Sequence, residues 1–483
     1  MVSQSLANPI LILEEHARTD PDAGFIKSAK QTITNAAALK TIKQIAYEFR
    51  RLGVKPRDMV AIDLPEVLSL LFMEAVLHEA ATSSLVTPNF AAPKGFQIDW
   101  FITNRADVSA PGGASKIVVD DRFLDLIGQN PYGISARDFG SADDVMWVIF
   151  SSGTTGTQKA IPVHVSLSDP ARESIIEPWF LRGRLLSFLP AKTPLGLFAF
   201  GVTTVAGVAF LAIGDNVPSE TIELVKQNEV RVFVMSPAQV AGFVGDLESR
   251  GETLPQIEVV FTVGTAMSPE LNDRLHAATE GCEILNVYAS AEGGVAAVRE
   301  YESDDPFDAG MVRPSTELQI VDDDGVVLPI GETGRIRYRS GLTASGYLGD
   351  AASMPEVWDG DWFYPGDLGS LREDGGLTLA GRASEIINAG GLKIDPVRLD
   401  QFATAHVGVL EAASFGYETA DGIQQVGIAL VTEDGFDVQA LVADFETTFG
   451  PAAPKLVGRL AEIPRNVMGK PLRLALAANY RES

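Results

Sequence analysis

Short apolar segments that alternate with helical patterns constrain the fold of this chain more than any other feature. Asp58–Asp63 has the pattern of a strand, and the apolar run Pro65–His78 after it has that of a helix. The alternation returns at Val230–Met235, a strand pattern, and at Pro237–Leu247, a helical one. Strands that alternate with helices predict an α/β fold whose layers surround a mostly parallel sheet.

The pattern changes near residue 310. Leu318–Val321 and Val326–Leu328 flank an Asp/Gly turn, which is typical of a hairpin, and Gly334–Arg339 alternates like a half-exposed strand. We therefore expect a β-rich subdomain here, followed by a short α+β pattern that runs to the last residue. We place a domain boundary near Ser384, which gives a large N-terminal domain, 1–383, and a small C-terminal domain, 384–483.

Composition excludes several classes of function. The 483 residues carry 38 basic and 64 acidic side chains, a net charge of −26, so nucleic acid is not expected as a partner. The single cysteine, Cys282, excludes an intrachain disulfide or a multi-cysteine zinc site. The five histidines show no metal-ligand spacing. Any metal is expected to be a hard cation on carboxylate and phosphate oxygens.

Two segments are relevant to secretion and to membrane insertion. Met1–Asn8 lacks the basic and apolar regions of a secretory signal. The apolar segment Leu195–Ile213 contains several glycines and is expected to be buried helix or strand, not a membrane span. We therefore expect a cytoplasmic protein.

A loop rich in serine, glycine and threonine follows the predicted buried strand Val145–Phe150. Glycines let a backbone fold closely around an anion, while N–H groups and hydroxyls donate to phosphate oxygens. Local composition leaves phosphate binding and an ordinary polar loop equally open. It is not a Walker A loop, because Gln158 stands where that motif needs glycine. The candidate phosphate ligands are Ser151, Ser152, Gly153, Thr154, Thr155, Gly156 and Lys159.

Two further candidate sites follow predicted strands. Gly264 and Thr265 end one strand before a helix, which is where ligands bind in open α/β sheets, although a plain turn is the alternative. Tyr288 could stack on a purine, and Glu292 could hold a magnesium ion beside phosphates. The alternatives are a core tyrosine and a solvated glutamate.

Three later residues carry charges suited to a nucleotide, and each has a plain alternative. Asp367 follows Gly366, so it could bind ribose hydroxyls or belong to an ordinary turn. Arg382 and Lys470 lie in glycine-containing segments, and either could be an ordinary surface residue. Gly391 stands in a Gly-Gly pair that could line a narrow tunnel or make a hairpin turn.

In combination these segments resemble, in order, the signature motifs of the adenylate-forming superfamily. That superfamily holds acyl- and aryl-CoA ligases, adenylation domains of peptide synthetases, and luciferases. The matching segments are Ser151–Lys159, Asn286–Gly294, Trp362–Leu368, Gly381–Pro396 and Ile463–Pro471. The resemblance implies a large N-terminal domain and a small, mobile C-terminal domain that swings about Ser384.

The resemblance also implies a role for each candidate. Lys159 and its loop would bind the β- and γ-phosphates, Glu292 would hold Mg²⁺, and Lys470 would bridge the carboxylate and the α-phosphate. Gly391 would line the tunnel for the pantetheine arm of coenzyme A. The remaining nucleotide contacts would be made by Gly264, Thr265, Tyr288, Ala289, Asp367 and Arg382.

The function implied is ATP-dependent activation of a small-molecule carboxylic acid to an acyl-adenylate, followed by transfer to coenzyme A. The cofactors implied are ATP, Mg²⁺ and coenzyme A. One alternative is a ligase that loads an acyl carrier protein. The other is a degenerate paralogue with little turnover, motivated by alanines at 160, 289 and 291 where relatives carry glycine, glycine and threonine. A homodimer is left open.

The acyl pocket is expected in the segment Pro190–Phe210. This segment is apolar and has no histidine, and Phe198–Gly201 stands where amino-acid-activating domains place an aspartate. The resemblance therefore implies an apolar acyl or aryl acid, not an amino acid.

Overall fold

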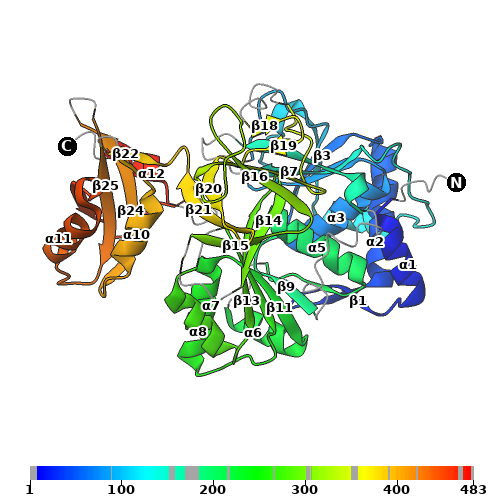
Figure 1. Ribbon diagram of the computed structural model, residues 1–483. Helices are drawn as coiled ribbons and strands as arrows, with labels where there is room; N and C mark the ends of the chain where they lie inside the picture. Colours follow the sequence, from blue (N-terminus) through cyan, green and yellow to red (C-terminus); the bar gives the residue numbers. More distant parts are fainter. Residues whose placement is uncertain are drawn as a thin grey trace. The chain divides into compact units, whose positions relative to one another are not determined.

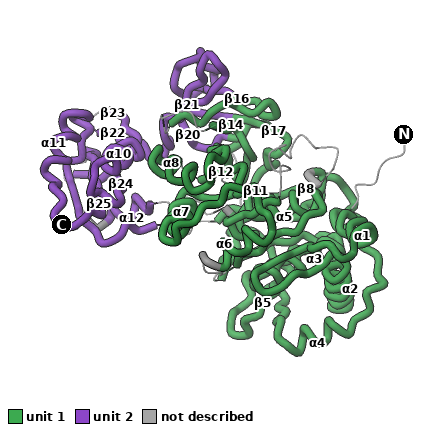
Figure 2. The backbone as a smooth tube through the Cα atoms, turned by 90° about the horizontal axis from the view of Figure 1, so that it is seen from below, with its two compact units in different colours: residues 1–318, 338–363 green, residues 319–337, 364–483 purple. Residues whose placement is uncertain are grey.

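The computed structural model describes residues 8–88, 90–151, 158–168, 184–214, 218–264, 267–300, 305, 307–349, 357–389, 392–419, 423–465 and 471–479. The chain divides into two compact units (Figure 2). Unit 1 holds residues 1–318 and 338–363, and unit 2 holds residues 319–337 and 364–483. Both mix helices with strands, so the predicted α/β class with a larger and a smaller part is confirmed. The boundary at Ser384 stays a prediction.

The first sheet of unit 1 has the strand order β6-β5-β3-β4-β7-β8. Its pairs are parallel from β6 to β7, and β8 runs antiparallel to β7. The predicted strand before the polar loop is β7, so the loop connects the last two strands of this sheet. The bounds are β3 Met59–Asp63, β4 Thr82–Leu85, β5 Trp100–Thr103, β6 Ser115–Val118, β7 Val145–Ser151 and β8 Lys159–His164.

Helices near the N-terminus cover this sheet (Figure 1). The apolar run that predicted a helix is α3 (Glu66–His78), and its residues from Ser69 to His78 are all buried. A helix that is apolar all round belongs in a core, which explains this burial. The other helices of this region are α1 Ile10–Thr19, α2 Asn35–Leu52 and α4 Asp121–Gln129.

The second sheet of unit 1 has parallel strands in the order β9-β11-β12-β13. Val232 and Val234 of β11 face one apolar cluster, while Phe233 and Met235 face another. Successive side chains of a strand point to opposite faces, so this sheet is buried on both sides. The bounds are β9 Arg184–Ser187, β11 Val230–Met235, β12 Val259–Val263 and β13 Glu283–Ser290.

Helices α7 and α8 pack beside these strands (Figure 1). Helix α7 begins with a capping box between Ser236 and Gln239, which satisfies amide groups of its first turn. Beyond β13 the sheet continues with antiparallel strands β14 and β15. The bounds are α6 Pro218–Gln227, α7 Pro237–Arg250, α8 Pro269–Ala278, β14 Gly294–Glu300 and β15 Asp308–Val312.

The apolar segment Leu195–Ile213, which was expected to be buried helix or strand, contains one of each. It forms α5 (Pro194–Ala206) and β10 (Phe210–Leu211), and β10 pairs with β1 (Gly24–Lys27), which also pairs with β2 (Thr32–Thr34). None of the helices in the described ranges combines the length and the apolarity that a bilayer crossing requires.

The β-rich part begins with β16 and β17, and the chain crosses between the units inside both strands. The predicted strand at 326–328 is reduced to an isolated bridge between Val321 and Val327. In unit 2, β20 pairs with β17 and with β21. The bounds are β16 Thr316–Val321, β17 Gly334–Ser340, β18 Trp358–Asp359, β19 Trp362–Phe363, β20 Asp367–Leu371 and β21 Gly376–Arg382.

The rest of unit 2 is the short α+β arrangement expected from the sequence. Strands β24, β25 and β26 form a sheet, and helices α10, α11 and α12 lie beside it in the orange and red part of Figure 1. The bounds are β22 Ile387–Ala389, β23 Leu392–Ile394, α10 Pro396–Thr404, β24 Val409–Glu418, β25 Gln424–Thr432, α11 Val438–Phe449, β26 Leu456–Arg459 and α12 Arg473–Asn479.

Candidate active site

The lysine of the polar loop is the first residue of β8. Lys159 is half-buried and pairs with Ser151, the last residue of β7. The two strands therefore bring both ends of the loop together, as a loop that wraps an anion requires. The candidates Ser152, Gly153, Thr154, Thr155 and Gly156 lie outside the described residues, and so does the side chain of Ser151.

Ala160, one of the departures from the family pattern, has a structural explanation. It is fully buried in an apolar cluster with Met59, Phe101 and Val148. A methyl group at this position therefore fills core space next to the loop. Lys159 occupies the preceding position of the same strand, and successive side chains of a strand point to opposite faces.

The carboxyl ends of β12 and β13 bring two predicted residues to the same edge of a parallel sheet. Gly264 follows β12 with a φ of +100°, a backbone conformation that favours glycine. Tyr288 is half-buried near the end of β13. Thr265 lies outside the described residues. Ala289 continues β13 as a strand residue opposite Val295, so a glycine is not needed there for backbone reasons.

Asn286 is a candidate that the motif reading passed over. Its Oδ1 accepts a hydrogen bond of 2.6 Å from Thr262 Oγ1, while its Nδ2 is buried and has no hydrogen-bond partner among the described residues. A buried amide donor left unpaired costs about 1–3 kcal/mol, which a ligand at this edge could recover. The sequence signal that could have identified Asn286 is its position two residues before Tyr288, in the matching segment Asn286–Gly294.

Glu292 lies in the turn between β13 and β14 and is half-buried. Its Oε1 accepts a hydrogen bond of 2.9 Å from the hydroxyl of Tyr347, and Lys159 Nζ lies 4.8 Å from the centre of the Tyr347 ring. The structure thus brings Glu292 and Lys159 to one aromatic side chain. Tyr347 was missed, because it belongs to none of the motifs that pointed to the site.

Ala291, the second departure beside the phosphates, packs against a small apolar cluster. That cluster contains Ile161, Ala344 and Tyr347. The methyl group of Ala291 therefore supports the residue that contacts both charges, in the place where relatives carry a hydroxyl.

The residues around Glu292 fit a magnesium ion. With Oε1 engaged by Tyr347, the second carboxylate oxygen remains available as a hard ligand. Within the described ranges, no group of three or more His, Cys, Asp and Glu side chains could hold a metal by itself. A single carboxylate suits Mg²⁺, which keeps several waters and shares its coordination with substrate phosphates.

Asp367 and Arg382 of unit 2 face each other across β20 and β21. They are register partners, and Arg382 Nε lies 3.2 Å from Asp367 Oδ1. Gly381 has a φ of +100°, and a side chain there would meet Asp395 at 2.6 Å. Burial raises the pKa of Asp395, which also caps α10 by accepting from the Val397 amide.

Gly391 and Lys470 lie outside the described residues, but the residues next to them are ordered by pairing. Ala389 and Leu392, the described residues on either side of Gly391, pair across β22 and β23. Arg465 and Pro471 form an isolated antiparallel bridge, which brings together the ends of the segment that carries Lys470.

The predicted hinge residue, Ser384, is exposed in a turn. The amides of Glu385 and Ile386 donate to the Arg382 carbonyl at 2.9 and 3.0 Å, which closes this turn. Arg473, at the start of α12, lies 3.6 Å from Glu385. An ion pair therefore joins the predicted hinge to the helix that follows the lysine segment.

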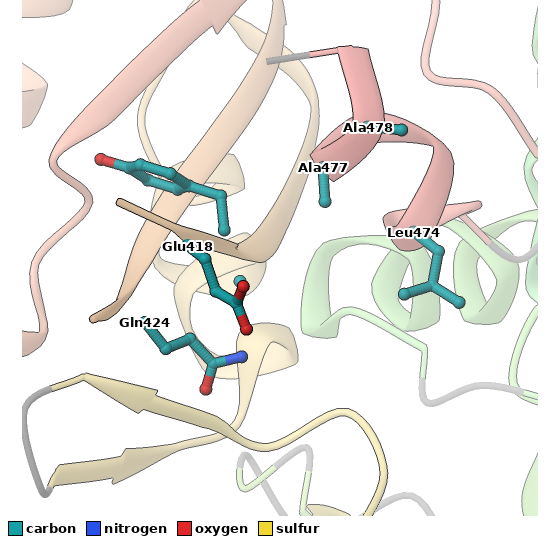
Figure 3. Close-up of a pocket in the computed structure, with 7 residues that line it drawn as sticks. Glu418, Gln424, Leu474, Ala477 and Ala478 are labelled. Carbon is teal, nitrogen blue, oxygen red and sulfur yellow. The ribbon is translucent and has the colours of Figure 1, made fainter. Parts of the chain in front are cut away.

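A small pocket of unit 2 lies among β24, β25 and α12 (Figure 3). Its volume is about 190 Å³, and Glu418 and Gln424 contribute its polar side chains. Glu418 brings a negative charge to this pocket, which disfavours the phosphates of a nucleotide. The lining residues are Gly416, Tyr417, Glu418, Gln424, Leu474, Ala477 and Ala478.

Comparison with known proteins shows the family of this chain. The AMP-binding enzyme family matches residues 13–348. The chain is 25% identical to 2-hydroxy-7-methoxy-5-methyl-1-naphthoate–CoA ligase of Streptomyces carzinostaticus, over 96% of this chain and 92% of the relative. It is 28% identical to the fatty acid–[acyl-carrier-protein] ligase MmaC of Mycobacterium marinum, over 70% and 68%.

A solved structure shows the same fold. O-succinylbenzoate coenzyme A synthetase from Bacillus subtilis, in complex with ATP and magnesium ion, superposes with a TM-score of 0.82 at 19% identity, covering 96% of this chain and 98% of that one. Because the family match spans most of the sequence, the chain belongs to the AMP-binding enzymes of the adenylate-forming superfamily.

Proposed function

We propose that this enzyme activates a carboxylic acid with ATP and transfers the acyl group to the thiol of coenzyme A. The observation that carries the proposal is the meeting of Lys159 and Glu292 at Tyr347. A cation for phosphate and a carboxylate for Mg²⁺, held within reach of one another, are what phosphoryl-group chemistry requires.

In the first step, a carboxylate oxygen of the substrate attacks the α-phosphorus of ATP. The bond between that phosphorus and the bridging oxygen breaks, and pyrophosphate leaves with the electron pair. Lys159 and its loop hold the β- and γ-phosphates, and Glu292 is the residue that would hold Mg²⁺. The metal neutralises phosphate charge when bound.

We assign a contact with adenosine to each of the nucleotide candidates. Asp367 accepts hydrogen bonds from the ribose hydroxyls, Arg382 contacts ribose and phosphate, and Tyr288 stacks on the purine. Asn286 donates its unpaired amide at the same sheet edge as Tyr288. Gly264, Thr265 and Ala289 leave room for the nucleotide because they are small.

Lys470 bridges the carboxylate and the α-phosphate during the first step. The C-terminal domain, 384–483, then turns about Ser384, which removes Lys470 from the site and brings Gly391 in. The coenzyme A sulfur attacks the acyl carbonyl carbon, AMP leaves with the bonding electrons, and the thiol proton passes to solvent. A domain rotation of this kind lets one site serve two reactions in turn.

The composition of α5 supports a substrate class. This helix belongs to the segment expected to form the acyl pocket, and its residues are apolar apart from two threonines. Such a segment favours an apolar acyl or aryl acid, and it offers no carboxylate for an α-amino group.

The test is a hydroxamate-trapping screen with ATP, Mg²⁺ and a panel of carboxylic acids. We expect hydroxamate and pyrophosphate with at least one apolar acid, and loss of both in Lys470→Ala with nucleotide affinity retained. ATP binding without pyrophosphate release across the panel would select the degenerate paralogue. Pyrophosphate exchange that survives Lys470→Ala would refute the role of that lysine.

An acyl carrier protein is the alternative to coenzyme A as acceptor of the acyl group, because a relative is named as an acyl-carrier-protein ligase. With an acid from the screen, the adenylated enzyme is offered coenzyme A and, separately, a phosphopantetheinylated carrier protein. Thioester on coenzyme A supports the proposal. Thioester on the carrier protein alone would select the alternative.

A further inference from the structure

The segment 341–349 of unit 1 is fastened to both sides of the phosphate site. The Leu348 amide donates to the Ala160 carbonyl at 2.8 Å, and the Ala344 amide donates to the Glu292 carbonyl at 2.7 Å. His164 Nε2 is also 2.9 Å from Ser345 Oγ. These contacts join the segment to β8 and to the β13–β14 turn, which belong to different sheets.

Tyr347 lies between these attachments and is only 8% exposed. Its ring packs edge-on against Trp358, with centroids 4.7 Å apart and planes at 81°. Aromatic pairs favour this geometry, so the orientation of the Tyr347 ring is set by packing. The hydroxyl and the face of the ring are therefore presented to Glu292 and Lys159 in one fixed arrangement.

The hydroxyl orients the carboxylate of Glu292. A hydrogen bond to Oε1 restricts the rotation of the carboxyl group and leaves the other oxygen for a cation. The neutral hydroxyl does this without adding a charge that would compete with Mg²⁺. Outer contacts of this kind normally tune how tightly a metal ligand binds.

The face of the ring holds the ammonium of Lys159. Lysine over a tyrosine face is attracted by the negative quadrupole of the ring but keeps its charge for an anion. In the part of the chain that the structure describes, no ion pair joins Lys159 to Glu292. If these opposite charges paired, they would neutralise each other and leave neither for phosphate or metal.

We propose that Tyr347 is a positioning residue that sets the metal affinity of Glu292 and separately steadies Lys159 for the nucleotide phosphates. This inference rests on the proposed function, because it assigns Glu292 to Mg²⁺ and Lys159 to phosphate. Two distinct contacts of one side chain predict two separable effects.

The experiment measures binding without turnover. Full-length protein is titrated with α,β-methylene-ATP by calorimetry in the absence of divalent metal. Free Mn²⁺ is then titrated into the protein–nucleotide complex and followed by its electron paramagnetic resonance signal. The variants are Tyr347→Phe, which loses only the hydroxyl, and Tyr347→Leu, which also loses the ring face. Tyr338→Phe is the matched control, because it loses another buried hydroxyl, 2.9 Å from Ser290 Oγ.

In Tyr347→Phe we expect Mn²⁺ affinity to fall about tenfold, since a hydrogen bond to a charged group is lost. Metal-free nucleotide affinity should stay close to that of the unchanged protein. In Tyr347→Leu the metal-free affinity should fall as well, by about threefold, because the cation–π contact is lost. Tyr338→Phe should leave both affinities unchanged.

Three outcomes would overturn the inference. Mn²⁺ affinity of Tyr347→Phe equal to that of the unchanged protein removes the role assigned to the hydroxyl. If Tyr347→Phe loses Mn²⁺ affinity and metal-free nucleotide affinity equally, the substitution has loosened the fold in general. The same conclusion follows if Tyr338→Phe shows the same losses of affinity. Failure of the unchanged protein to bind the nucleotide at all would instead refute the proposed function.

Discussion

Arg382 Nε lies 3.2 Å from Asp367 Oδ1, and the two residues face each other across strands β20 and β21 of unit 2. The two residues were nominated by separate motifs, yet the hairpin makes them neighbours. Each is partly exposed, with 32% of the Arg382 side chain and 19% of the Asp367 side chain accessible. Partly exposed ion pairs stabilise folds little, so a role in ligand binding explains this pair better than stability does.

Replacing Asp367 should therefore affect nucleotide binding more than folding. We expect Asp367→Asn to weaken ATP binding at least about tenfold, because hydrogen bonds to a charged acceptor are lost. The free energy of unfolding should change by less than about 1 kcal/mol. Calorimetric titration with ATP and urea denaturation measure the two quantities. Asp374→Asn, in the turn of the same hairpin, is the matched control and should leave ATP affinity intact; equal losses in both variants would contradict the assignment.

Glu74 on α3 should make stability depend on pH. Burial without a compensating charge raises its pKa from the ordinary 4.5 to about 8. Because the folded-state pKa is raised, stability from this group is full below 4.5 and is lost as the pH rises toward 8. Glu74→Gln, which stays neutral, should therefore be more stable than the parent at pH 7 by up to about 3 kcal/mol.

Denaturation of both proteins between pH 5 and about 8 checks the Glu74 prediction, since this is where the protonation states differ. The difference in unfolding free energy should grow with pH. Glu223→Gln on α6, whose carboxyl is exposed, is a suitable control and should show a flat difference. A constant difference for Glu74→Gln across this range would show that its carboxyl ionises normally in the folded protein.

Arg473 should be important for the stability of unit 2. It lies 2.7 Å from Asp400 Oδ2, and burial raises the pKa of Asp400 in spite of that neighbour. Arg473→Leu would leave Asp400 without its counter-charge, at a cost of about 3 kcal/mol. Since protonated Asp400 needs no counter-charge, the loss of stability in Arg473→Leu should be smaller at acidic pH.

Hydrogen exchange of α10 and β24 in the full chain measures the Arg473 effect. Arg465→Leu provides the comparison, because the Arg465–Glu411 pair is exposed on both sides and its loss should cost less than about 1 kcal/mol. If the amides of α10 and β24 are equally protected from exchange in the two variants, the Arg473–Asp400 pair stabilises unit 2 no more than a surface pair does.

The single cysteine should be inert in the folded chain. Burial raises the pKa of Cys282 to about 11 from an ordinary 9.0, so little thiolate exists at pH 8. We expect iodoacetamide to label the native protein at least about a hundredfold more slowly than the urea-unfolded chain, because the thiolate is the reactive form. Mass spectrometry follows the reaction, with Cys282→Ala as the unlabelled control. Rapid labelling without denaturant would show that this part of unit 1 opens readily.

Local pattern predicted the elements that carry the site. The apolar run at 145–150 is β7, the run at 65–78 is α3, and the segment at 283–288 is β13. These predictions succeed because the length of an apolar run and its flanking residues are local signals of a strand or a buried helix. The strand expected at 326–328 is only a bridge between Val327 and Val321, although the Leu328 amide also bonds back to the Ile320 carbonyl.

The sequence by itself determined which charges exist and which motif each belongs to: Lys159 at the end of a polar loop, Glu292 after a predicted strand, and Asp367 and Arg382 in two separate segments. Only the tertiary structure decided that Tyr347 contacts both Lys159 and Glu292. The physical reason is the distance along the sequence over which each kind of interaction acts. Periodicity and turn chemistry act over a few residues, whereas this meeting depends on how two sheets pack and on backbone bonds between distant segments.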